Sequence, residues 1–157
     1  MSDTPSRPTQ AQLDRYAEQF SQSIPMRHLG VRLSFPEGRK VVAVIPELQH
    51  HHRGGLGSAS AVNGAVLAGL FDLVLGCTPA LVDPTKRCAT LQLSMTFQRP
   101  ATGASIRAEA ELDSHGKSTL FASARILDDQ GNVCARAQGV VRVSTQPWSS
   151  GDSPSIG

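Results

Sequence analysis

Residues 59–82 read ASAVNGAVLAGLFDLVLGCTPALV, a stretch that is apolar on almost every side of the helix it would form. A helix without a polar stripe is either buried in a core or spans a membrane, and this length is close to the roughly 20 residues that a bilayer requires. Asn63, Asp72 and Pro79, together with three internal glycines, argue against a membrane span. We therefore expect a buried helix in a soluble domain, covered by other elements of the chain.

The segments around this helix alternate between apolar and polar residues. In residues 89–97, every second residue from Leu91 to Phe97 is apolar. Such alternation is typical of antiparallel strands with one face on the core and the other in water. The strands expected are Val31 to Phe35, Lys40 to Ile45, Ala89 to Phe97, Ser105 to Leu112, Thr119 to Leu127 and Val133 to Val143. One apolar helix wrapped by a long antiparallel sheet is an α+β architecture, the hotdog fold.

The ends of the chain differ from the middle. A short amphipathic helix is expected at Gln10 to Ser23, where apolar residues are spaced for one helical face. Residues 1–9 and 144–157 are rich in small polar residues and proline, so we expect both to be disordered. The predicted organisation is one hotdog domain, residues 10–143, between two disordered ends.

Composition narrows the class of protein. The chain has 157 residues, enough for a single domain, and its formal net charge of +2 is too weak to indicate a nucleic-acid partner. Three cysteines without a CxxC pair do not suggest a disulfide framework or a zinc site, and they fit a reducing compartment. The first ten residues carry no apolar stretch of the signal-peptide type. We expect a soluble cytoplasmic protein without a nucleic-acid or membrane partner.

Asp72 is the residue that stands out chemically. A carboxylate among leucines, valine and phenylalanine is costly to bury unless it is paired or takes part in chemistry. The alternative is that Asp72 faces water or caps a neighbouring loop.

The start of the same helix is a second candidate. A glycine-rich loop, residues 54–58, leads into Asn63 and Gly64. Backbone N–H groups at a helix N-terminus are unpaired and favour negative charge, so such an end could hold a developing oxyanion. The alternative is a loop that merely turns the chain.

The spacing of the two candidates indicates an oligomer. Gly64 and Asp72 are eight residues apart, about 12 Å along a helix. One helix cannot place both groups on one carbonyl. Two antiparallel helices in a two-fold dimer bring Gly64 of one subunit beside Asp72 of the other. We therefore predict a homodimer or a larger homo-oligomer, such as a tetramer, with the site at the interface.

Other motifs carry less weight. The glycines and serines near residue 58 do not form a GxSxG elbow, and Gly116-Lys117-Ser118 lacks the earlier glycine of a phosphate-binding loop. Three adjacent histidines, His50 to His52, cannot all point at one ion and no carboxylate follows at a ligand spacing, so we expect a solvated loop and no metal.

Asn63 to Asp72, with Gly76 following, resembles the signature of the phenylacetate-degradation (PaaI-like) hotdog thioesterases. That signature is His-Gly-Gly, a small and apolar helix, and Asp nine residues after the His. The resemblance continues through about residues 26–143. Its further parts are Thr90 to Pro100, which resembles the family's next strand ending at Arg-Pro or Ser-Pro, His115 to Thr119, which resembles its Gly-Lys/Arg hairpin, and Asp129 to Ala135, which resembles its last turn.

The resemblance implies an acyl-CoA thioesterase. In such an enzyme the Gly64 N–H polarises the thioester carbonyl, and Asp72 of the partner subunit is the nucleophile or the general base. Thr90 falls where the family often has a Ser or Thr that positions water or the carboxylate. Lys117, with Gly116 beside it, and Arg99 would meet the CoA phosphates. No cofactor is implied, because CoA is part of the substrate.

Two positions depart from the family pattern. Asn63 replaces the usual His, and Gly57 stands where members often carry Asn or Gln to position the reacting water. These departures keep open a non-catalytic protein that binds acyl-CoA. A hotdog dehydratase would require a catalytic His in a loop before its helix, and the spacing of His50 to His52 does not support one.

Overall fold

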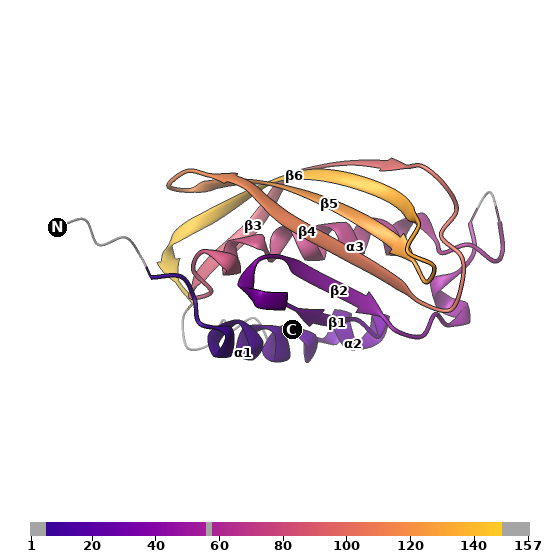
Figure 1. Ribbon diagram of the computed structural model, residues 1–157, viewed down its shortest axis with the longest axis horizontal. Coiled ribbons are helices and arrows are strands. Elements are labelled where there is room, and N and C mark those ends of the chain that lie inside the picture. The colour runs from indigo at the N-terminus through magenta and orange to yellow at the C-terminus, as the bar shows by residue number, and fades with distance from the viewer. Residues whose placement is uncertain (1–5, 56–57, 149–157) are drawn as a thin grey trace.

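One curled antiparallel sheet forms most of the computed structural model, which describes residues 6–55 and 58–148 (Figure 1). The strand order is β1-β2-β4-β5-β6-β3, and every neighbouring pair is antiparallel. The strands are β1 (Arg32–Ser34), β2 (Val41–Ile45), β3 (Lys86–Phe97), β4 (Ile106–His115), β5 (Thr119–Asp128) and β6 (Val133–Pro147). Each strand predicted from alternation is present, and the α+β prediction is confirmed.

Helix α3 (Gly64–Gly76) runs along the inner face of this sheet, as Figure 1 shows. It contacts strands β2 to β6. The buried side chains of α3 are Leu67, Leu70, Phe71, Leu73, Val74 and Leu75. Burying a side chain of this size contributes about 1.5–3 kcal/mol of transfer free energy, so this helix is the centre of the core.

The helix is shorter than the apolar stretch that contains it. It ends at Gly76, and a 3-10 helix, η3 (Thr78–Leu81), follows with Pro79 in its first turn. Proline has no N–H group to continue an α-helix. Gly64–Leu81 is long and apolar enough to cross a membrane by length and composition, yet 56% of the segment is buried inside the protein. That burial is what a core helix requires.

Two helices precede the sheet. α1 (Gln10–Ser21) begins at a capping box formed by Thr9 and Gln12, and it buries Leu13, Tyr16 and Ala17. α2 (Ile24–Leu29) was not predicted from the sequence. It ends at Gly30, whose φ of 66° is a conformation that favours glycine.

The ordered domain extends past residue 143. Strand β6 continues to Pro147, and the Trp148 N–H donates to the Thr85 carbonyl at 3.0 Å. The expected disordered tail therefore begins too early at Ser144, because these residues pair with the start of β3. Residues 1–5 and 149–157 lie outside the described part of the chain.

One side of the sheet and helix is left open in the single chain. β3 is an edge strand of the sheet, and its Leu91 and Phe97 are 59% and 51% exposed. The prediction that all apolar residues of this strand face the core is wrong for these two, whereas Leu93 and Met95 do pack against the core. A register shift between Thr90 and Gln92 interrupts the alternation.

Candidate active site

Asn63 shapes the N-terminus of α3. Its side-chain oxygen accepts from the Ala65 N–H at 2.8 Å, and its side-chain N–H donates to the Gly54 carbonyl at 2.7 Å. Asparagine is among the preferred residues at this capping position. The Asn63 side chain thus takes the Ala65 N–H. The Gly64 N–H has no acceptor among the described residues. The helix start therefore presents one open donor at its positive end.

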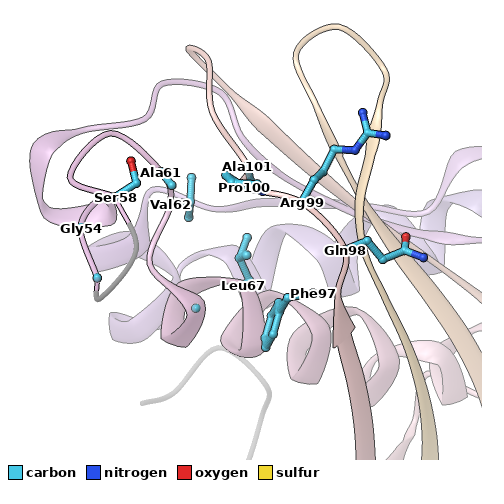
Figure 2. Close-up of a pocket in the computed structure, with 12 residues that line it drawn as sticks. Gly54, Ser58, Ala61, Val62, Leu67, Phe97, Gln98, Arg99, Pro100 and Ala101 are labelled. Carbon is cyan, nitrogen blue, oxygen red and sulfur yellow. The ribbon is translucent and has the colours of Figure 1, made fainter.

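Gly64 lines a cavity of about 420 Å³. One wall is the pre-helix loop, which we define as residues 54–55 and 58–63. The other wall is residues 98–101, the first part of the β3–β4 loop (residues 98–105), and Leu67 and Phe97 lie below them (Figure 2). Arg99 is exposed and extends outward beside the cavity. The structure thus brings Asn63, Gly64 and Arg99 to one end of the molecule.

Asp72 lies on the open side of α3, two turns further along. Its side chain is exposed in the single chain and makes no hydrogen bond or ion pair with the described residues. A second cavity, of about 280 Å³, contains Asp72 and Thr90 in its lining. A Cβ added at Gly76 would lie 3.2 Å from Thr90 Oγ1. The Thr90 hydroxyl therefore packs against the helix one turn beyond Asp72, on the same side.

The N-terminal helices supply a wall of this second cavity that sequence reasoning missed. Tyr16, Phe20 and Met26 line it, and so does Trp148 from the end of β6. The rings of Tyr16 and Phe20 stack with their centroids 6.0 Å apart. No local pattern marks these residues, because they are about 45 to 75 positions from Asp72 in sequence.

Two thiols also line the Asp72 cavity, and both are protonated at neutral pH. Burial raises the pKa of the Cys88 thiol to about 11. Burial also raises the pKa of Cys77, with a smaller contribution from the nearby Cys88. A protonated thiol is a poor nucleophile. These cysteines therefore act as an apolar wall, and Asp72 is the acidic side chain of the cavity lining.

The site residues separate into two groups within one chain. Gly64 and Asp72 are about 12 Å apart along α3 at 1.5 Å per residue. Lys117 and Gly116 lie in the exposed β4–β5 hairpin, just before Thr119. Thr119 pairs with Arg142 of β6, and Arg142 pairs with Ala89 of β3, so the hairpin lies at the same height along the sheet as Ala89. Eight residues along β3, about 26 Å, separate that level from Phe97 and the neighbouring Arg99. Lys117 is therefore on the Asp72 side, and Arg99 is on the Gly64 side.

His52 is not the solvated loop residue that was expected. It ends a 3-10 helix, η2 (His50–His52), and is 1% exposed. Its Nδ1 accepts from the Gln49 N–H and its Nε2 donates to the Leu29 carbonyl, both at 2.9 Å. With both nitrogens engaged it cannot serve as an acid or base. Gly57 lies outside the described residues, and the described residues contain no group of three His, Cys, Asp or Glu side chains that could hold a metal ion.

Comparison with known proteins bears on the family and the fold. The family model of the thioesterase superfamily matches residues 59–135, the span from the pre-helix loop to β6. A comparison with curated proteins finds no matching sequence.

Solved structures share the fold at low sequence identity. The PaaI protein of the phenylacetic acid degradation operon of Escherichia coli superposes with a TM-score of 0.75 at 17% identity, covering 90% of this chain and 100% of that one. A Shewanella oneidensis protein related to the thioesterase superfamily has a TM-score of 0.75 at 22% identity, covering 88% and 100%. A Haemophilus influenzae thioesterase has a TM-score of 0.73 at 17% identity, covering 84% and 90%.

The sheet wrapped around α3 is thus a hotdog fold. Residues 59–135 match the thioesterase superfamily, and this match together with the shared fold supports a thioester hydrolase.

Proposed function

We propose that the protein is an acyl-CoA thioesterase that works as a homodimer, or as a tetramer made of two such dimers. The observation that carries this proposal is the pairing of an open N–H at Gly64 with an unpaired carboxylate at Asp72 on one helix. Each group lines its own cavity, and neither cavity alone contains both. A thioester carbonyl requires both groups within a few ångströms.

The open surface of the chain supports the two-fold arrangement. The outward side of α3 carries the small residues Ala65, Ala68 and Gly69 beside Asp72, so a second helix can approach closely. β3 leaves a long unpaired strand edge, which proteins normally cover. An antiparallel partner helix puts Gly64 of one subunit against Asp72 of the other, twice per dimer.

The reaction follows from these two groups. The Gly64 N–H donates to the thioester oxygen and stabilises the negative charge that develops there. Asp72 of the partner subunit either attacks the carbonyl carbon or takes a proton from the water that attacks it. The carbon–sulfur bond breaks, the CoA sulfur leaves, and water supplies the oxygen of the free acid. Thr90 lies where its hydroxyl can orient the water or the carboxylate.

The two cavities then divide the substrate between them. The cavity beside Asp72, walled by aromatic rings and thiols, accepts the acyl group. Lys117 and Gly116 approach from the subunit that supplies Asp72, and Arg99 approaches from the subunit that supplies Gly64. Their positive charges meet the CoA phosphates. No cofactor takes part.

The thiols bear on the compartment. Cys77, Cys88 and Cys134 are all free in the structure. Unpaired cysteines suit a reducing environment, which supports a cytoplasmic location.

The test is Asp72→Asn, which keeps the size of the side chain and removes its charge. Turnover of an acyl-CoA panel is expected to fall about a hundredfold or more, with little change in substrate affinity. Because Asp72 is exposed and makes no bond within the described chain, the melting temperature is expected to stay near that of the wild type. Glu18→Gln, an equivalent change on the exposed side of α1, is the matched control and is expected to be silent.

Two results would redirect the proposal. Unchanged turnover in Asp72→Asn would remove this carboxylate from the reaction. A wild-type protein that binds acyl-CoA and hydrolyses none of the panel would favour the non-catalytic binding protein, in which Asn63 and Gly57 replace the usual polar residues.

A further inference from the structure

Arg53 joins the two walls of the Gly64 cavity. Its guanidinium donates to the Ser60 carbonyl at 2.8 Å and to the Gly103 carbonyl at 2.6 Å. Ser60 belongs to the pre-helix loop, and Gly103 belongs to the β3–β4 loop, fifty residues away from Arg53 in sequence. Arg53 itself is not part of the cavity lining. Its two acceptors lie in the loops behind the lining, so Arg53 acts on the cavity through those loops.

The backbone hydrogen bonds of the pre-helix loop lie near its base, next to the start of α3. Gly54 N–H donates to Ala61 O at 2.9 Å, and Arg53 pairs with Val62 in an isolated bridge. These bonds close the base of the loop next to Asn63. The bond from Val62 N–H to Ala101 O, 2.8 Å, is the backbone link to the opposite wall. Arg53 adds a second link between the walls, further from the helix.

The acceptor on the far wall is itself held in place. Gly103 has a φ of +105°, and a Cβ there would lie 2.5 Å from Asp129 Oδ1. The neighbouring Ala104 N–H donates to Asp129 Oδ2 at 2.8 Å. The β3–β4 loop is thus fixed to the turn before β6. The Arg53 guanidinium therefore binds an acceptor whose position is fixed.

We infer that Arg53 is a positioning residue that sets the separation of the two cavity walls and, through it, the placement of the thioester against the Gly64 N–H. The inference rests on the proposed function. Guanidinium is planar and presents its donors in a fixed fork, so the two carbonyls it binds are held at a fixed spacing. Catalysis by a backbone donor depends on such spacing, because an error of about 1 Å can cost on the order of a hundredfold in rate.

Arg53→Lys separates geometry from charge. Lysine keeps the positive charge but is a single point donor that cannot reproduce the fork. We expect kcat to fall tenfold or more with a smaller change in KM, because the substrate still binds but lies badly against the N–H. Hydrogen exchange at the Gly54 and Val62 amides is expected to become faster, since the loop loses its second link. Arg39→Lys is the control, because Arg39 is exposed and its partner Glu37 lies 3.8 Å away at the surface.

The outcomes distinguish this inference from the proposed function. Wild-type protein and Asp72→Asn are measured in the same assay, and equal rates in those two would count against the proposed function alone. The exchange measurement needs no activity and still tests the link between the walls. Arg53→Lys with wild-type kcat per folded molecule overturns the positioning role, even if its melting temperature falls. Unchanged exchange at both amides overturns the link itself.

Discussion

Removing the Asn63 side chain tests how the helix start is held. Asn63→Ala deletes the acceptor for Ala65 N–H and the donor to Gly54 O, at 2.8 and 2.7 Å. A lost N-cap costs about 1 kcal/mol, and a lost neutral hydrogen bond costs about 1 kcal/mol more. The free energy of unfolding is therefore expected to fall by about 2 kcal/mol. For a chain of this size that corresponds to a melting temperature lower by about 4–8 °C.

Asn63→Asp makes the experiment specific to catalysis. Aspartate keeps the capping acceptor and suits the positive end of the helix, but it loses the donor to Gly54 O, so the free energy of unfolding is expected to fall by about 1 kcal/mol, less than in Asn63→Ala. Its negative charge lies beside Gly64 N–H, where it opposes the developing oxyanion, and turnover is expected to fall at least tenfold.

The Asn63 series is measured by urea unfolding at one protein concentration, together with acyl-CoA turnover. Asn63→His, the residue usual in the resembled family, is expected to stay active. If Asn63→Ala unfolds like the wild type, the two bonds contribute nothing. If Asn63→Asp hydrolyses at the wild-type rate, the oxyanion does not form at Gly64.

Four more changes probe other parts of the molecule. Burial lowers the pKa of His52 below its ordinary 6.5, against an opposing effect of the Leu29 carbonyl, so the folded state keeps the ring neutral. The unfolded state then binds more protons, and stability is expected to fall as pH drops from 6.5 through the lower folded pKa; melting curves between pH 7.5 and 5 check this, and His52→Gln should flatten them. A Cβ at Gly69 meets nothing within 4 Å in the chain, but a leucine there would separate paired helices, so light scattering is expected to show monomers for Gly69→Leu while Gly69→Ala stays dimeric. Lys117→Ala is expected to raise the KM for acyl-CoA, most at low salt, with little change in kcat. Gly103→Ala forces a Cβ to 2.5 Å from Asp129 and strains a φ of +105°, so urea unfolding should show a loss of more than about 1 kcal/mol.

The sheet was predictable because alternation is a local property. The segment Thr119 to Leu127 became β5, one residue longer, and the segment Val133 to Val143 became most of β6. The missed part of β6 is polar, and it is a strand because Lys86 pairs with Pro147. α2 was not predicted because it has six residues and none of them is buried, so it shows no apolar periodicity. Where pairing or docking decides the structure, the sequence carries no local signal.

The candidate residues Gly64 and Asp72 could be picked out from the sequence, whereas the residues that hold the start of the helix could not. Gly64 and Asp72 stand out because a glycine at a helix start and a carboxylate among apolar residues are rare in one helix. Arg53 and His52 do not stand out, since their partners lie up to fifty residues away and are backbone groups, which no residue type encodes. The burial of His52 follows from those partners, whereas the residues around it in sequence read as a polar loop.

The two candidate groups on α3, the Gly64 N–H and the Asp72 carboxylate, are held in different ways, and the difference bears on how the proposed site works. At the Gly64 end, Asn63, Arg53 and His52 each bind backbone groups, and the Asn63 N–H donates to His52 O at 2.8 Å. A donor that must stabilise charge gains most from being fixed before the reaction begins. Two turns further along, Asp72 makes no hydrogen bond or ion pair with the described residues. In the proposed dimer the positive N-terminus of the partner helix attracts this carboxylate. Assembly then completes the half of the site that the fold of one chain leaves open.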